Sequence, residues 1–363
     1  MERAEFLGEL TKLYSETISV CGTHGKTTTT SMISRAFIDA EKDPSIQVGA
    51  DMKELGNENF RVGKSSYFIL ESCEYVRSFL MFHPHAVVLL NIEEDHLDYY
   101  KDLDDIKSAF KAFVTSVPSD GVIVLNADDS DCIDVCKDLN VKRVTFSVKN
   151  NTADFYAKNI NLLENGSYAF DLCFNNKTEH IELGILGYHN VYNALATIAL
   201  CLHYGIDIKN IKSSLLNFTG ASRRCDLVGS INGAKIFDDY AHHPTEIKAT
   251  IDAILKVKHN KLWVVFQPHT FTRTRALFNE FVTAFEKADT VILTDIYAAR
   301  EIDTGIVSSE QLSEKINEFS KNCIYIKTLD EVKDYFKNNL KEGDILLTLG
   351  AGTITNVGRD LVK

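Results

Sequence analysis

The sequence has no Cys-x-x-Cys pair, only five prolines and no long apolar run. No apolar stretch approaches the roughly 18 residues of a membrane span, and the opening MERAEFLGEL lacks the apolar segment of a signal peptide. The eight cysteines are scattered, whereas a secreted disulfide scaffold would be shorter and denser in cysteine. These absences predict a soluble cytoplasmic protein with reduced thiols and no membrane partner.

Basic residues are also in deficit. The 363 residues include 39 lysines and arginines against 51 aspartates and glutamates, which gives a formal net charge of −12. Nucleic-acid binding depends on basic surface, so this balance argues against a nucleic-acid partner but allows a local basic pocket for a phosphorylated ligand. The length exceeds what one compact core accommodates, which predicts two domains.

Short β-rich runs that end in polar or glycine residues alternate with helical patterns. The clearest runs are TISVCG (17–22), YFIL (67–70), AVVLL (86–90) and VIVLN (122–126). After the first run, Ile33, Phe37 and Ala40 recur at helical spacing. The alternation predicts an α/β fold with a mainly parallel sheet, in which ligands bind outside the carboxyl ends of the strands.

Three segments are expected: a lead-in at 1–16, a central domain at 17–219 and a C-terminal domain at 220–363. Alternating runs with Asn-Gly and Asn-Asn turns over 149–185 predict an antiparallel insertion or edge. The next segment, 188–205, predicts a helix that stops at its glycine. The C-terminal domain repeats the α/β pattern with the runs AKIFDDY, KLWVVFQ, DTVILTD and DILLTLG.

A glycine-rich loop lies between the first predicted strand and helix. Its residues are Gly22, Thr23, His24, Gly25, Lys26, Thr27 and Thr28. The backbone N–H groups of such a loop form an anion cradle, the lysine reaches the β- and γ-phosphates, and the Thr27 hydroxyl ligates Mg²⁺. The loop is shorter than the strict G-x-x-x-x-G-K-[ST] motif. A turn with a solvated lysine is the alternative, but GKTTTT in this position predicts a nucleotide site.

Acidic residues follow two of the predicted strands. Glu71 ends its strand beside the cradle, and one or two carboxylates with substrate phosphates suffice for Mg²⁺. His96, in NIEEDH, is a less usual magnesium ligand, and on residue chemistry alone a helix-start or hydrogen-bonding role is the stronger interpretation. Farther on, His189 and Asn193 share one face of the 188–205 helix, where they either read a purine edge or form an ordinary helix start.

The C-terminal domain opens with a dense set of titratable groups. Arg223 and Arg224 precede DDYAHHP (238–244), and QPH (267–269) precedes Arg273. Adjacent histidines seldom converge on one ion, so substrate and phosphate contacts are favoured over zinc. Arginine forks suit carboxylate and phosphate groups, with an exposed helix start as the alternative for Arg273.

Seven segments together resemble the Mur ligase family: GTHGKTTTT, NIEEDHLDYY, YHNVYNAL, GASRRCD, DDYAHHPTE, FQPHTFTRT and TDIYAA. They follow the family's order from residue 17 to the C-terminus. The resemblance implies a central P-loop-type ATPase domain and a C-terminal Rossmann-like domain. It also implies an ATP- and Mg²⁺-dependent ligase that adds L-alanine to UDP-N-acetylmuramate through an acyl phosphate, in the synthesis of peptidoglycan precursors.

By motif position, the resemblance also implies a role for each candidate residue. Lys26 would stabilise the migrating phosphoryl group, and Thr27, Glu71 and His96 would hold Mg²⁺. The nucleotide would be contacted by the loop and by His189, Asn193, Arg224 and Asp239. The acyl group would meet the amino acid among Tyr240, His242, His243, His269 and Arg273.

Three departures from the family pattern accompany the resemblance. Only 16 residues precede the first predicted strand, so the family's UDP-binding domain is expected to be absent or separately supplied. Thr270 stands where many relatives have arginine, and Arg300 where many have glycine. Three alternatives stay open: a ligase that recycles a tripeptide onto UDP-muramate, an ATP-binding fragment that is inactive alone, and a P-loop motor or kinase.

Overall fold

The computed structural model describes residues 2–363 and divides into two compact units. The first unit ends at Ser222, and the second runs from Arg223 to Lys363. Each unit contains one sheet, with ten strands in the first and six in the second. The two units are described separately below.

The first unit contains strands β1 to β10. Their bounds are Glu16–Cys21, Ser45–Met52, Glu58–Arg61, Tyr67–Glu71, Ala86–Leu89, Val122–Asn126, Lys142–Ser147, Phe155–Leu162, Ser167–Phe174 and Lys177–Leu186. The α-helices α1 to α6 span Arg3–Thr11, Lys26–Asp39, Leu103–Thr115, Ser130–Cys136, His189–His203 and Ile208–Asn217. Two 3₁₀ helices, η1 and η2, span Lys53–Leu55 and Tyr75–Met81.

The ten strands form one sheet in the order β10-β9-β8-β7-β6-β5-β1-β4-β2-β3. Pairing is parallel from β2 through β4, β1, β5, β6 and β7 to β8, and antiparallel at the two edges. The central runs β5 and β6 are buried throughout, as a parallel sheet covered on both faces requires. The predicted antiparallel segment corresponds to β8, β9 and β10.

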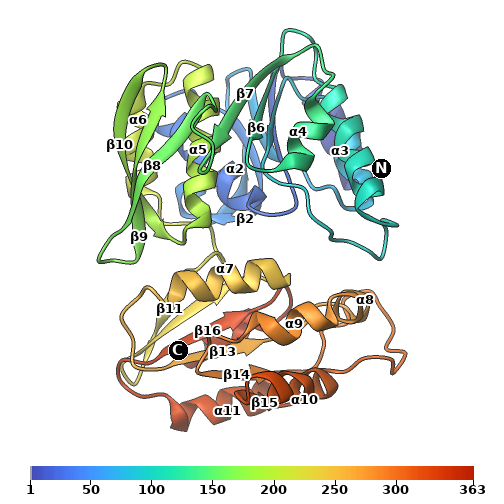
Figure 1. Ribbon diagram of the computed structural model, residues 1–363, viewed down its shortest axis with the longest axis vertical. Helices are drawn as coiled ribbons and strands as arrows, with labels where there is room; N and C mark the ends of the chain where they lie inside the picture. The colour runs from blue at the N-terminus through green and yellow to red at the C-terminus, as the bar shows by residue number, and fades with distance from the viewer. Residues whose placement is uncertain (1) are drawn as a thin grey trace. The chain divides into compact units, whose positions relative to one another are not determined.

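Side-chain alternation along the strands divides the first unit into two cores. Ile18 and Val20 of β1 face a core with α2, α5 and α6, whereas Cys21 and the alternate residues of β5, Val87 and Leu89, face a core with α3 and α4. Figure 1 shows α5 and α6 on one side of the strands and α3 and α4 on the other. Both helical layers therefore hold the carboxyl ends of the central strands in fixed positions.

The second unit contains strands β11 to β16 and helices α7 to α12. The strands span Asp226–Ile231, Ala234–Asp239, Leu262–Phe266, Thr290–Leu293, Cys323–Tyr325 and Ile345–Leu349. The helices span Pro244–Ile254, Phe271–Ala276, Phe278–Ala284, Ser309–Phe319, Leu329–Asn339 and Thr355–Leu361.

The sheet of the second unit has the order β11-β12-β16-β13-β14-β15 and is parallel except for β11. Trp263 of β13 contacts Phe336 of α11. Phe266, on the opposite face of the same strand, contacts Phe281 of α9 and Phe285 directly after it. Helices therefore cover both faces, and the predicted α/β fold with a large, mostly parallel sheet followed by a second sheet is confirmed (Figure 1).

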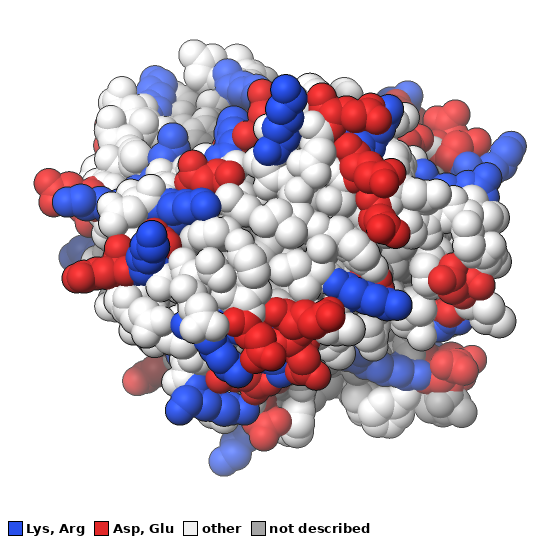
Figure 2. All heavy atoms as spheres, turned by 90° about the horizontal axis from the view of Figure 1, so that it is seen from below, with Lys and Arg blue, Asp and Glu red and all other residues white. Residues whose placement is uncertain are grey.

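Surface charge is mixed on the face shown in Figure 2, where lysines and arginines lie among aspartates and glutamates without forming one continuous basic area. Within residues 2–363, every helix is too short or too polar to cross a bilayer.

Candidate functional site

The loop that joins β1 to α2 depends on two glycines with positive φ. Gly22 has φ 137° and Gly25, the N-cap of α2, has φ 83°, both in a region that side chains with a Cβ rarely adopt. A Cβ on Gly25 would lie 2.7 Å from Asn193 Oδ1, and one on Gly22 would lie 3.0 Å from Leu90 Cβ. The loop therefore approaches β5 and α5 closely, with its backbone and the helix start available to an anion.

Asn91, the second residue after β5, fixes this loop. Its Oδ1 accepts the His24 N–H at 2.7 Å, its Nδ2 donates to the His24 carbonyl at 3.0 Å, and its carbonyl accepts the Thr23 N–H at 3.1 Å. Thr23 Oγ1 also accepts the Glu93 N–H at 2.8 Å. These bonds tie the loop to the next parallel strand and hold its shape without a ligand.

The Lys26 ammonium is directed back into the loop. Its Nζ donates to the Gly22 carbonyl at 2.6 Å, to the Thr23 carbonyl at 2.9 Å and to both carboxylate oxygens of Glu74, at 2.9 and 3.1 Å. Burial alone would lower the pKa of Lys26, but the Glu74 carboxylate and nearby Cys73 and Glu71 hold it above its ordinary value. The lysine is thus kept charged beside the proposed phosphate cradle.

Glu74 was not predicted from the sequence. It lies three residues beyond the end of β4, directly before η2, and its side chain is 3% exposed. Its carbonyl accepts the hydroxyl of the buried Tyr100 and the N–H of Arg77. The signal that could have found it is the second carboxylate in ESCE, at the carboxyl end of a strand that neighbours the loop.

Three residues were predicted to bind a metal ion. Thr27 is buried in the first turn of α2, and Glu71 Oε2 accepts the Gly49 N–H at 2.7 Å at the end of β4. His96 Nε2 lies 4.0 Å from Glu74 Oε1 and 3.8 Å from Asp95 Oδ2. Hydroxyl and carboxylate oxygens around a phosphate cradle fit Mg²⁺, which keeps several waters and needs few protein ligands. The metal role of these residues stays a prediction.

Helix α5 contributes the two residues that were predicted to contact adenine. Asn193 is buried against Gly25 and donates from Nδ2 to Asn190 Oδ1 at 2.8 Å. His189, the first residue of α5, is exposed one helical turn away. The structure therefore brings Asn193 to the loop, while the adenine contact itself stays a prediction.

In the second unit, Asp239 ends β12 and accepts backbone N–H groups from Cys225 and Ala241, each at 2.7 Å. Burial raises the pKa of Asp239 to about 6, although Arg224 and these two N–H groups act in the opposite direction. The carboxyl group thus shapes the turn that carries Tyr240.

Five predicted residues form a continuous row in the second unit. The guanidinium carbon of Arg224 lies 5.1 Å from the centre of the Tyr240 ring, which is 5.4 Å from the His242 ring. The His242 ring is 6.0 Å from the His269 ring, whose Nδ1 lies 3.4 Å from Arg273 Nη1. These side chains come from three segments distant in sequence and bring together two arginines with aromatic and imidazole rings.

His243 lies beside this row as the N-cap of α7. Its Nδ1 accepts the Thr245 N–H at 3.3 Å, and Pro244 is the first helical residue. Glu246 accepts the backbone N–H groups of His242 and His243 at 3.1 and 3.3 Å. A capping box therefore fixes the histidine pair, and Glu246 has a structural role that was not predicted from the sequence.

Thr270 caps α8 with an unusual backbone conformation. Its φ is 67° and ψ is 144°, and its hydroxyl accepts the Arg273 N–H at 3.4 Å. A β-branched residue with positive φ is strained, and such strain persists where surrounding bonds impose it. Here the Thr270 N–H donates to the Tyr297 carbonyl at 2.9 Å, and the Thr270 carbonyl accepts the Thr274 hydroxyl. The strained turn positions His269 and Arg273.

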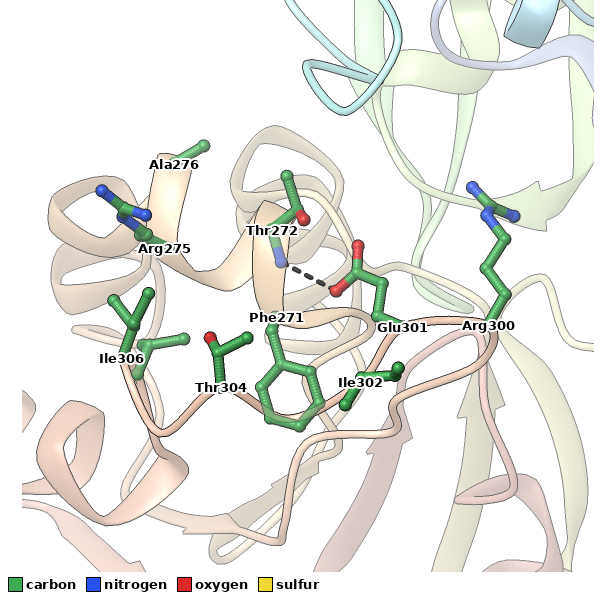
Figure 3. A pocket seen from close by; sticks show the side chains of 10 residues that line it. Phe271, Thr272, Arg275, Ala276, Arg300, Glu301, Ile302, Thr304 and Ile306 are labelled. Carbon is green, nitrogen blue, oxygen red and sulfur yellow. Dashed lines mark hydrogen bonds between the residues drawn. The ribbon is translucent and has the colours of Figure 1, made fainter.

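A hollow of about 640 Å³ lies on α8 and the 300–307 loop. Figure 3 shows Phe271 and Ile302 beside Thr272, whose N–H donates to Glu301 at 2.9 Å. Arg300, one of the two residues that depart from the family pattern, lines this hollow, whereas the row from Arg224 to Arg273 does not. The hollow is therefore separate from the predicted substrate residues.

Two family models match the chain. The "Mur ligase middle domain" matches residues 20–201, and the "Mur ligase, glutamate ligase domain" matches residues 223–352. A UDP-N-acetylmuramate–L-alanine ligase of Acetivibrio thermocellus is 46% identical over 364 residues, which cover 100% of this chain and 77% of the relative. These matches extend over both units.

Solved structures also resemble the chain. A UDP-N-acetylmuramate–alanine ligase of Thermotoga maritima has a TM-score of 0.84 at 26% identity, covering 99% of this chain and 78% of the other. A murein peptide ligase of Psychrobacter arcticus has a TM-score of 0.73 at the same identity, with 99% and 79% covered. The resemblance is therefore stronger in fold to the alanine ligase.

Proposed function

The chain belongs to the Mur ligase family, and on this premise we propose that it joins L-alanine to the carboxylate of UDP-N-acetylmuramate. The enzyme is an ATP-dependent, ADP-forming amide ligase. The observation that carries the proposal is the 46% identity over the whole chain with a ligase of that name. The chain spans 77% of that relative's length.

The reaction divides into two steps that balance without a redox partner. A carboxylate oxygen of UDP-N-acetylmuramate attacks the γ-phosphorus of ATP, and ADP leaves. The nitrogen of L-alanine then attacks the acyl carbon, an amine proton is lost, and inorganic phosphate leaves with the original carboxylate oxygen. Phosphoryl transfer needs mainly positioning and charge neutralisation from the protein.

The loop residues are proposed to supply the first step. Backbone N–H groups of residues 22–28 would bind the phosphates, and the Lys26 ammonium would neutralise charge on the transferred group. This role is supported by the two positive-φ glycines and by the close approach of Asn193, which leaves no room for a side chain at Gly25. His189 and Asn193 would contact the base, and Arg224 and Asp239 are proposed to contact the nucleotide as well.

Thr27, Glu71 and His96 are proposed to hold Mg²⁺. The ion would neutralise phosphate charge, as it does in other phosphoryl-transfer sites. The carboxylate of Glu71 at the end of β4 and the hydroxyl of Thr27 in the first turn of α2 supply the oxygens that this ion prefers.

The row in the second unit is proposed to supply the second step. Tyr240, His242, His243, His269 and Arg273 would line the place where the acyl group meets the amine. The pairing of Arg273 with His269 supports this role, because a guanidinium beside an imidazole offers several N–H donors to a carboxylate or phosphate oxygen.

A tripeptide-recycling ligase is the second candidate, favoured by the HHPT and QPH segments that it shares with this chain. ADP release measured with UDP-N-acetylmuramate and either L-alanine or the tripeptide distinguishes the two. We expect release only when UDP-N-acetylmuramate and L-alanine are both present. Equal stimulation by the tripeptide would assign the recycling reaction, and nucleotide binding without turnover would make this chain an ATP-binding part of a larger enzyme.

A further inference from the structure

The partner of the Lys26 ammonium is a carboxylate that none of the predicted roles uses. Among the bonds of Lys26 Nζ, those to Gly22 and Thr23 are made by loop carbonyls, and only those to Glu74 are made by a charged group. The side chains of Lys26 and Glu74 are 12% and 3% exposed, so water screens this ion pair little.

Glu74 is held independently of the lysine. Its backbone carbonyl accepts the hydroxyl of Tyr100, which is buried, and the N–H of Arg77 at 2.8 Å. A carboxylate on a fixed backbone can orient a flexible lysine, because the four-carbon stem of lysine otherwise samples many rotamers. The contact therefore restricts the ammonium to one side of the loop.

An ammonium has three N–H donors, and the two carbonyls and the carboxylate together account for three directions. A phosphate that binds the lysine must take over at least one of them. The loop carbonyls are fixed by the backbone, so the bond to Glu74 is the one that a second anion can share.

We propose that Glu74 is a positioning residue for phosphoryl transfer: it holds the Lys26 ammonium over the loop and shares it with the terminal phosphate of ATP. This inference rests on the proposed function of the loop. It assigns Glu74 no contact with substrate, since its effect passes through Lys26. It also separates Glu74 from Glu71, whose carboxylate is bonded to the Gly49 N–H instead.

The first test compares Glu74→Gln with Glu54→Gln in the full chain. Glu54 also forms a shielded ion pair, with Arg35 at 2.8 Å and a side chain 9% exposed, but lies outside the loop. We expect Glu74→Gln to lower kcat about tenfold, because the Lys26 ammonium is no longer oriented. The Kd for MgATP should stay within about twofold or decrease, because the substitution also removes a negative charge near the phosphates. Glu54→Gln should change neither value.

Circular dichroism and thermal unfolding of both variants exclude misfolding as the cause. A kcat for Glu74→Gln equal to that of the wild type, or a change matched by Glu54→Gln, would overturn the proposal. Glu74→Asp, which keeps the charge on a shorter side chain, should recover part of the lost kcat. A tenfold rise in the Mg²⁺ concentration needed for activity would instead make Glu74 a metal ligand and overturn the proposal.

A double-mutant cycle tests whether Glu74 acts through Lys26. The kcat at saturating MgATP is measured for the wild type, Lys26→Gln, Glu74→Gln and the double variant. We expect Glu74→Gln to leave the residual kcat unchanged on the Lys26→Gln background. A persistent loss of kcat there would mean that Glu74 acts on the reaction independently of Lys26 and would overturn the proposal. Wild-type protein that binds no nucleotide would overturn the proposed function as well, whereas normal binding with an unaltered Glu74→Gln variant overturns only the role of Glu74.

Discussion

Within the glycine-rich loop of residues 22–28, Gly25 is the most constrained position, since both its backbone and its surroundings exclude a side chain. It adopts φ 83° at the N-terminus of α2, and an added Cβ would lie 2.7 Å from Asn193 Oδ1. The strain of positive φ and the steric conflict are separate effects. Gly56 is a control that has only the first, because its φ is 75° and no atom lies within 4 Å of an added Cβ.

Gly25→Ala is expected to destabilise the protein by about 1–3 kcal/mol and to abolish MgATP binding, because the loop must move away from Asn193. Gly56→Ala should show a similar strain penalty of about 1 kcal/mol with normal MgATP affinity. Urea unfolding gives the stabilities and calorimetry gives the affinities. Equal MgATP affinity in the two variants would contradict the assignment of the loop.

The raised pKa of Asp239 predicts that the free energy of unfolding depends on pH. Burial raises its pKa to about 6 from 3.8, so the folded protein binds this proton more strongly than the unfolded chain. Its contribution to stability therefore falls as pH rises from about 4 to about 6, by up to roughly 3 kcal/mol. Unfolding free energies of the wild type and Asp239→Asn, measured across this range, should differ by an amount that changes with pH. A constant difference would show that Asp239 has an ordinary pKa.

At the level of secondary structure, the carboxyl ends of β1, β4 and β5 converge on the glycine-rich loop of residues 22–28. The sequence predicted these three strands because their apolar runs are continuous and buried on both faces. It did not predict β3, β11 and β15, which lie at sheet edges, or β2, which lies next to β3; these strands are short or interrupted by polar and glycine residues. Pairing with a neighbouring strand, rather than a continuous apolar run, decides such strands.

The segment ESCE shows a second carboxylate near the end of β4, but the contact of Glu74 with Lys26 could not be predicted from it. The segment after β4 is a 3₁₀ helix in which Val76 and Arg77 have φ of 49° and 56°, so it carries no regular period. Only the folded path of this segment places the carboxylate on Lys26. The row from Arg224 to Arg273 was predictable residue by residue from the family motifs, but its ring-to-ring order depends on where β12 and β13 lie in the sheet.

Substitutions of Asn91 test whether its side-chain hydrogen bonds, which join the end of β5 to the loop, support MgATP binding. Asn91→Ala removes two side-chain hydrogen bonds to His24 and is expected to weaken MgATP binding about tenfold. Asn91→Asp keeps the acceptor for the His24 N–H, loses the donor and adds a negative charge, so its affinity should fall at least as far. Calorimetric titration provides the affinities. Asn150→Ala, which breaks only a turn with Thr152, is the control and should bind normally.

In the whole molecule, the residues proposed to carry out the reaction are divided between the two units. The glycine-rich loop of residues 22–28, proposed to bind the nucleotide, lies in the unit that ends at Ser222, and the row of Tyr240, His242, His269 and Arg273 lies in the unit that begins at Arg223. A ligand that binds the native protein stabilises it in proportion to the logarithm of its concentration over Kd. Nucleotide binding should therefore be visible in the unfolding of the intact chain.

MgATP at about one hundred times its Kd is expected to stabilise the wild type by roughly 3 kcal/mol and to raise its melting temperature by several degrees. Lys26→Met should abolish this shift, because it removes the ammonium that is proposed to bind the phosphates. Lys212→Met, which breaks an ion pair with Glu179, is the matched control and should retain it. Differential scanning fluorimetry measures all three, and a full shift in Lys26→Met would remove the lysine from nucleotide binding.

The transfer of oxygen from the acid to phosphate tests the proposed ligation most directly. UDP-N-acetylmuramate labelled with ¹⁸O in its carboxylate is incubated with MgATP and L-alanine, and the phosphate formed is analysed by mass spectrometry. Activation as an acyl phosphate predicts one ¹⁸O atom in each phosphate released, with ADP as the nucleotide product. Unlabelled phosphate accompanying amide formation, or AMP in place of ADP, would contradict the account.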